Sequence, residues 1–194
     1  MSAQDYNLVT FTPVEAGEAS GVNPNTQRQW RNRGYLPRYD ARSTTRFNAV
    51  EVAAMIVRRA LNEASSKLNA DEPFIALAAM HVLEFAIKTR PDLIPWERTE
   101  AVFTEPGKPL YSYLVARNPP VRDALAPLAS PHMLEPLSEL GRLWMCKSLD
   151  HVDHIMQLGE PAESVVLIDL QTLGEKLARG FPGPIATLAA SEAA

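Results

Sequence analysis

The fold is decided by residues 12–36, TPVEAGEASGVNPNTQRQWRNRGYL. The stretch opens with a strong helix start, because Thr12 suits an N-cap and Pro13 suits the first helical position. Glu15 then completes a capping box with Thr12. Gly21 breaks the helical pattern. We therefore expect a short helix that ends at Gly21.

A second helix start follows by the same logic. Asn23 is a preferred N-cap residue, and Pro24 suits the first helical position. The helix is predicted over 24–33, and Gly34 supplies the left-handed residue that ends many helices. Two short helices joined by a tight turn that contains glycine form a helix-turn-helix. The stretch therefore predicts this motif.

The two sides of the second predicted helix differ in chemistry. Thr26 and Trp30 are four positions apart and share a face. Val22 and Leu36 are near enough in sequence to complete a small core. The opposite side carries Asn25, Arg28, Gln29 and Asn32. Asparagine, glutamine and arginine side chains can make bidentate contacts to base edges in the major groove. The alternative is that these polar residues only keep an exposed helix face soluble.

An arginine-bearing extended segment is predicted next. Thr44, Thr45 and Phe47 favour extended structure, which predicts a short hairpin or wing. The arginines on it are Arg38, Arg42 and Arg46. Asn48 then starts a third predicted helix, whose apolar residues follow helical spacing as far as Leu61.

Charge is divided unevenly along the chain. The formal net charge of the 194 residues is −4, which taken alone argues against a nucleic-acid partner. Residues 1–60 hold eight arginines, no lysine and five acids, a net charge of +3, so residues 61–194 carry −7. Arginine without lysine, in a segment also rich in Asn and Gln, favours contact with anions or nucleic acid. The acidic remainder would be repelled by phosphate.

Residues 12–59 resemble the winged helix-turn-helix of MerR-type bacterial regulators and of related phage DNA-binding proteins. The matching residues are Thr12, Pro13, Gly21, Val22, Thr26, Arg28, Trp30, residues 34–37, the pair Arg46 and Phe47, and the helix start at Asn48. The resemblance covers about a quarter of the chain. It departs at Gln27, where such helices usually carry an apolar packing residue, and the long dimerising helix of MerR regulators is not evident.

The resemblance implies a role for each matched position. The family reads the major groove with its second helix and places wing arginines on the DNA backbone. Asn25, Arg28 and Gln29 would then approach bases, while Arg42 and Arg46 would hold phosphates. The full set of DNA contacts expected on this basis is Thr12, Asn25, Thr26, Arg28, Gln29, Arg31, Asn32, Arg38, Arg42 and Arg46.

The expected fold class is α+β, with the winged helix-turn-helix followed by a mixed domain that contains a small antiparallel sheet. The predicted divisions are a DNA-binding domain over 1–62, a linker over 63–71, an α+β domain over 72–181 and a flexible tail over 182–194. Apolar residues predict a buried helix over 74–88. Strands are predicted over 101–104, 110–115, 143–149 and 164–170, and a further helix over 170–179.

The second predicted domain contains no catalytic motif that we recognise, so we expect no enzyme, no cofactor and no metal. Cys146, His151 and His154 have a spacing that zinc ligands can adopt, but no second cysteine pair accompanies them, and a solvated polar turn is the favoured interpretation. Aromatic residues of the second predicted domain could line an apolar ligand pocket or belong to the core, and the core is the favoured interpretation. These are Trp96, Phe103, Tyr111, Tyr113 and Trp144.

The sequence predicts a cytoplasmic protein that associates with the nucleoid. A single cysteine suits a reducing compartment, residues 1–10 carry no signal-peptide pattern, and the longest apolar stretch, 74–87, is too short to span a bilayer.

We expect a sequence-specific, DNA-binding transcriptional regulator that binds double-stranded DNA. Its second domain would form a homodimer or receive a small-molecule or protein signal. The alternative is a phage or mobile-element protein, similar to excisionases or small terminase subunits, that uses the same module for assembly.

Overall fold

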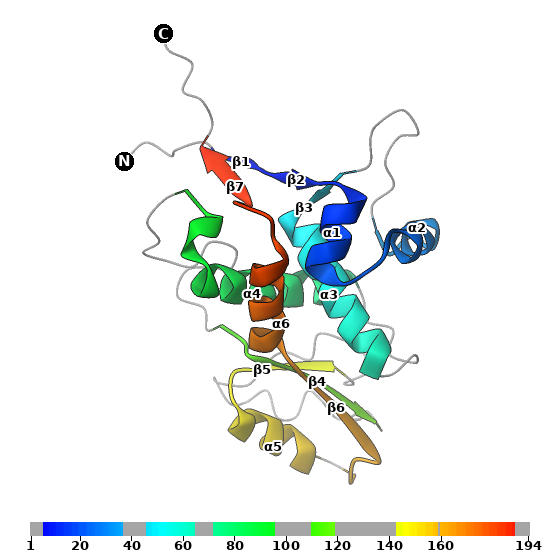
Figure 1. Cartoon of the computed structure of the whole chain (residues 1–194). Helices are drawn as coiled ribbons and strands as arrows, with labels where there is room; N and C mark the ends of the chain where they lie inside the picture. The colour runs from blue at the N-terminus through cyan, green and yellow to red at the C-terminus, as the bar shows by residue number, and fades with distance from the viewer. Residues whose placement is uncertain are drawn as a thin grey trace.

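The computed structural model describes residues 6–36, 46–64, 72–95, 110–118, 143–158 and 160–188. Over these residues the chain is a mixed α+β fold with small antiparallel sheets, as the sequence predicts (Figure 1). The helices are α1 (Pro13–Ser20), α2 (Pro24–Asn32), α3 (Ala49–Ala64), α4 (Glu72–Thr89), α5 (Leu149–Gln157) and α6 (Leu170–Gly180), with a short 3-10 helix η1 (Pro91–Leu93). The strands are β1 (Tyr6–Leu8), β2 (Thr10–Phe11), β3 (Phe47–Asn48), β4 (Tyr113–Asn118), β5 (Leu143–Cys146), β6 (Ser164–Asp169) and β7 (Ala186–Leu188).

A three-stranded antiparallel sheet lies between two layers of helices. Its order is β5-β4-β6, so β4 is central. Figure 1 shows α5 on one side of this sheet and α4 and α6 on the other. Leu114 and Ala116 of β4 point into the core beneath α4 and α6. Val115 points the other way, into a smaller cluster with Val152 and Ile155 of α5.

The two ends of the described chain lie side by side. β1 pairs with β7 in an antiparallel ladder in which Asn7 lies opposite Thr187 (Figure 1). Ile185 and Ala186, just before and within β7, are buried. The prediction of a flexible tail is therefore wrong over 182–188, because this segment has both a strand partner and core contacts. Residues 189–194 lie outside the described residues.

One continuous apolar core joins the N-terminal helices to the C-terminal layer. It runs from Phe11 to Ile185 and includes buried residues of α1, α3, α4 and α6. The backbones of α1 and α6 approach closely, since a Cβ added at Gly180 would lie 2.5 Å from Ala19 Cα. The division into domains at 63–71 stays a prediction, and its residues 65–71 lie outside the described part of the chain.

The C-terminal end of α6 is capped from α4's side of the core. Arg90 follows α4, and its Nη1 donates to the carbonyl oxygens of Ala178 and Phe181, each at 2.8 Å. Asp92 holds the same guanidinium at 2.9 Å, and this hydrogen bond keeps the pKa of the Asp92 carboxyl below its usual value. Helix C-terminal carbonyls need such donors. The contact ties residues about ninety positions apart.

Several predicted elements are confirmed and two strand predictions are corrected, because the strand predicted over 110–115 is β4, which runs from Tyr113 to Asn118. The helices over 74–88 and 170–179 and the strand over 164–170 match α4, α6 and β6. The predicted strand over 143–149 is too long, because β5 ends at Cys146 and α5 begins at Leu149. The sequence interpretation missed α5 altogether. The strand predicted over 101–104 lies outside the described residues.

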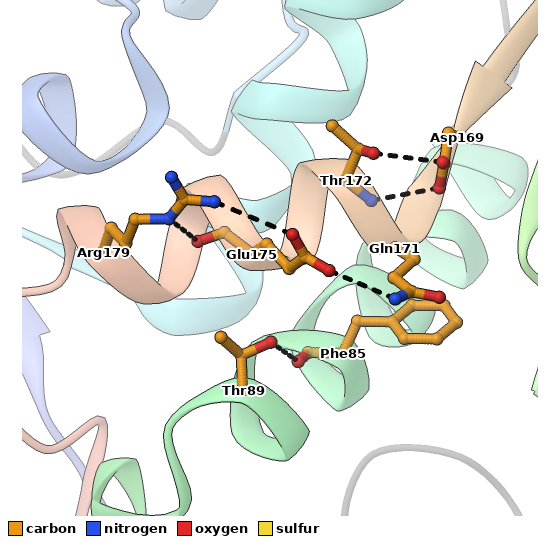
Figure 2. A network of polar contacts seen from close by, with 7 residues as sticks. All are labelled: Phe85, Thr89, Asp169, Gln171, Thr172, Glu175 and Arg179. Atoms are coloured by element: carbon orange, nitrogen blue, oxygen red, sulfur yellow. Dashed lines mark hydrogen bonds and ion pairs between the residues drawn. The ribbon is translucent and has the colours of Figure 1, made fainter.

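The outer face of α6 carries a row of polar contacts (Figure 2). Asp169, the last residue of β6, caps the helix by accepting hydrogen bonds from the backbone N–H and the hydroxyl of Thr172, each at 3.0 Å. Glu175 accepts a hydrogen bond from Gln171 and pairs with Arg179 one turn later. The strand-to-helix junction is therefore fixed by side chains as well as by the core.

No helix in the described ranges is both long and apolar enough to cross a membrane.

His81 of α4 is 2% exposed, and its Nδ1 accepts a hydrogen bond from the backbone N–H of Tyr111 at 3.4 Å. Burial lowers the pKa of His81 from 6.5 to about 4. The unfolded chain binds a proton below pH 6.5 that the folded chain does not, so stability falls as the pH falls from 6.5 toward 4. We expect a loss of about 1.4 kcal/mol per pH unit in this window from this residue. Urea unfolding of the wild type and of His81→Gln at several pH values measures it, and equal slopes in the two proteins would refute it.

Candidate nucleic-acid interface

Both short N-terminal helices begin as the sequence predicts. Thr12 Oγ1 accepts a hydrogen bond from the Glu15 N–H, and the Glu15 carboxylate accepts one from the Thr12 N–H at 2.7 Å, which completes the capping box. These bonds from Thr12, with the nearby charge of Arg46, hold the pKa of the Glu15 carboxyl below its usual value. Asn23 caps α2 by accepting from the Thr26 N–H at 2.9 Å.

The two helices end at glycines with left-handed backbone. Gly21 has φ 70° and Gly34 has φ 81°. After α2, the Gly34 N–H donates to Arg31 O and the Tyr35 N–H donates to Trp30 O, the pair of bonds that defines a Schellman motif. Both predicted helix ends are confirmed.

Gln27 fixes the angle between α1 and α2. It is 1% exposed, and its Nε2 donates to the carbonyl oxygens of Pro13 at 2.9 Å and Val22 at 2.7 Å. One side chain of α2 thus bonds the first turn of α1 and the connection between the helices. Trp30 lies on the same buried side of α2, as predicted, with Leu36 also buried. The polar residue at position 27 is therefore part of the packing.

The opposite side of α2 faces solvent and carries only polar and cationic side chains. Figure 1 shows α2 at the periphery of the molecule. The predicted base-contacting residues are all exposed and gather on this side: Asn25, Arg28, Gln29 and Asn32. Their spacing of three or four residues places them in one stripe along the helix. The helix contains no acidic residue. Thr26 is partly buried at the edge of the stripe.

Arg33 also belongs to this exposed stripe, and the sequence interpretation left it out. It follows α2 directly and is exposed. Its position is four residues after Gln29, a spacing that places both on the same side of a helix. The helical spacing in the sequence is therefore enough to identify Arg33 as part of the stripe. The predicted helix over 24–33 already contained it.

Two other arginines near α2 pack on aromatic rings. The Arg31 guanidinium lies 5.3 Å from the ring centroid of Phe47 in β3. The Arg58 guanidinium of α3 lies 5.0 Å from the ring centroid of Tyr35. Cation–π contacts of this kind hold the arginine plane against its neighbour. Arg31 thus lies on the side of α2 toward β3, apart from the exposed stripe.

The partner of strand β3 does not come from the predicted hairpin or wing that carries Arg38, Arg42 and Arg46. Strand β3 pairs with β2, so that Phe47 lies opposite Phe11 and Asn48 opposite Thr10. Arg46, next to this ladder, is exposed, and its Nη1 donates to Thr10 O at 3.4 Å. The predicted wing residues Arg38 and Arg42 lie outside the described residues.

The cysteine and histidines considered for zinc do not form a site in the described part of the chain. Cys146 is fully buried on β5, and burial raises the pKa of its thiol to about 12. His151 and His154 lie on α5, so the predicted polar turn is wrong and the segment is a helix. Among the described residues, no three metal-ligating side chains gather closely enough to hold an ion.

Comparison with protein-family models and with curated proteins finds no match to this chain.

Proposed function

We propose that the chain binds double-stranded DNA through a winged helix-turn-helix to which α1, α2 and the β2–β3 ladder contribute. The observation that carries the proposal is the exposed stripe of α2. It presents amide and guanidinium groups in a row, without an acid, on a helix whose other side is locked into the core. Such groups can read donors and acceptors on base edges, and a single helix fits the major groove.

The exposed residues in and around α2 support two separate roles in DNA binding. Base edges are recognised by the stripe, with Arg28 as its central cation, and phosphates by arginines at the margin of the helix. Arg46 suits the second role because it is exposed beside the β2–β3 ladder, and Arg33 because it extends the stripe at its C-terminal end. Phosphate contacts position a protein on DNA, whereas base contacts determine sequence preference.

The simplest biological role for such a protein is a transcriptional regulator. A phage or mobile-element protein that uses the module for assembly is the second candidate. Genome-wide footprinting with the full chain separates them, since a regulator occupies promoters, whereas an assembly factor occupies an attachment or packaging site.

Arg28→Ala is expected to weaken specific DNA binding by about 1–3 kcal/mol and to relax the preference at one base position. The reason is the loss of a bidentate donor from the centre of the stripe. The measurement is a titration of the full chain with the duplex that it selects from a random pool, at fixed salt. Arg179→Ala is the matched control, because it removes the same charge from an exposed residue of α6. Equal affinity of the Arg28 variant and the wild type would refute the assignment of α2, and failure of the wild type to select any sequence would refute sequence-specific binding.

Arg46→Ala is expected to act differently. It should weaken binding to all duplexes to a similar degree, because a phosphate contact carries no sequence information. The slope of log affinity against log salt should become shallower by about one. Binding isotherms at four salt concentrations, with the selected duplex and a scrambled one, test this. An unchanged slope would contradict a phosphate contact at Arg46.

A further inference from the structure

Strand β6 forms an edge of the three-stranded sheet. It pairs along its whole length with β4, from Ser164 opposite Asn118 to Asp169 opposite Tyr113. On its other side, no strand among the described residues pairs with it. Edge strands expose a row of backbone donors and acceptors that can pair with another chain.

The hydrogen-bond pattern shows which residues of β6 present that row. The Leu170 N–H, directly after β6, donates to Ser112 O next to β4. In an antiparallel strand, alternate residues direct their N–H and C=O groups to opposite sides. Even-numbered residues of β6 therefore bond β4, and the N–H and C=O groups of Val165 and Leu167 point to the free edge.

The same two positions carry an apolar surface. Their side chains lie on the α5 side of the sheet, where Val165 packs against the cluster around Val115. Leu167 is 47% exposed, one of few large apolar residues with that exposure in the described part of the chain. Natural edge strands are commonly protected by proline, lysine or an inward charge. The sequence of β6, SVVLID, contains none of the first two and has its single charge at the end.

The edge is also held rigid. Arg117 of β4 is 2% exposed and donates to the carbonyl oxygens of Leu158 and Glu160 in the segment that leads into β6. At the other end, Thr172 holds the Asp169 carboxylate along α6 (Figure 2). A strand that is fixed at both ends loses little conformational entropy when it binds a partner.

We propose that β6 pairs with β6 of a second copy of this chain, antiparallel and with Leu167 opposite Leu167. A twofold axis perpendicular to the sheet generates this pairing and joins the two sheets into one. It puts Leu167 against its counterpart on the α5 side and covers the exposed side chains. The neighbouring symmetric register, centred on Val166, would bring Glu163, which directly precedes β6 and donates its N–H to Asn118 O, close to Asp169 at both ends of the pair. Like charges directly opposite destabilise a strand pair, so charge selects the Leu167 register.

The partner is a second copy because the edge is self-complementary. The centre of β6 is apolar and uncharged, with Glu163 directly before the strand and Asp169 as its last residue. In the Leu167 register, Asp169 faces Val165 of the second copy, and no acid faces an acid. This dimer does not depend on DNA binding, since only residues of the sheet form it.

The first test is the mass of the full chain in solution by sedimentation equilibrium. The wild type should be a dimer, about twice 21.4 kDa. Leu167→Lys places two ammonium groups opposite each other and should raise the dimer dissociation constant by about tenfold or more. Leu149→Lys is the control, because Leu149 is 53% exposed on α5 and lies away from the edge. It should leave the dimer intact. A monomeric wild type, or a Leu167→Lys variant that dimerises like the wild type, would overturn the proposal.

The second test keeps the fold and reports the register. Opposite residues of a hydrogen-bonded antiparallel pair have Cα atoms about 5.5 Å apart, which a disulfide can span. Leu167→Cys should therefore give a covalent dimer under mild oxidation with copper phenanthroline, whereas Val165→Cys and Leu149→Cys should not. The native Cys146 is buried and contributes little background. Cross-linking through Val165→Cys but not Leu167→Cys would overturn the register, and no cross-link at either position would overturn the interface.

Discussion

Gly174→Ala is expected to lower the free energy of unfolding by about 3 kcal/mol, although alanine is the better helix former. Gly174 lies in α6 where this helix crosses α4. A Cβ added there would be 2.4 Å from Phe85 Cβ and 2.7 Å from the backbone oxygen of Val82. Backbone atoms of α4 cannot turn aside as a flexible side chain does, so the helices must separate. Urea unfolding at pH 7.5 measures the change.

Gly183→Ala is the matched control for this variant. Gly183 follows α6, and a Cβ added there would meet no atom within 4 Å. Where the backbone tolerates it, the change from glycine to alanine raises stability by about 0.4–1 kcal/mol, because it reduces the entropy of the unfolded chain. We expect unchanged or slightly raised stability. If Gly174→Ala behaved like this control, the close approach of α4 and α6 would be wrong.

Gln27→Glu is expected to cost about 3–5 kcal/mol. The side chain is buried, and its amide donates to the carbonyl oxygens of Pro13 and Val22. A carboxylate has no donor and would face two carbonyl oxygens in a site that water does not reach. The proposed function adds a second expected result: because this amide sets the angle between α1 and α2, Gln27→Glu should also weaken the proposed DNA binding.

The pH dependence separates this mechanism from a general loss of packing. Burial and the facing oxygens should raise the pKa of the introduced carboxyl in the folded state above its unfolded value of about 4.3. The stability difference from the wild type should then shrink as the pH falls from 7 toward that value, because protonation restores one donor. Gln29→Glu is the control, since Gln29 is exposed two positions along the same helix. A pH-independent difference for Gln27→Glu would contradict the buried amide.

Local chemistry made the N-terminal helices predictable. Capping boxes, prolines at first helical positions and glycines at left-handed ends act over a few residues, so Thr12, Asn23 and Gly34 show in the sequence what they do in the structure. The polar stripe of α2 was predictable for the same reason, because helical spacing alone places Asn25 and Arg28 on one side. Its function stays a prediction that the DNA titrations will test.

Long-range pairing was not predictable from the same signals. The partner of Phe47 is Phe11, across a separation of thirty-six positions, and a strand of two residues has no periodicity to detect. α5 was missed because its buried residues, Val152 and Ile155, occupy one narrow side of a short helix beside histidines that suggested a polar turn.

By itself, the sequence determined where α1 and α2 begin and end, that α2 has a buried and a polar side, and that basic charge gathers in the first sixty residues. Only the tertiary structure decided that β7 returns to β1, that Gln27 bonds α1, and that β6 lies at the edge of the sheet formed by the described strands. The physical reason is the range of the interactions. Caps and helical faces are fixed by neighbours within one turn, whereas strand partners and buried amides are selected by a core assembled from residues far apart in the chain.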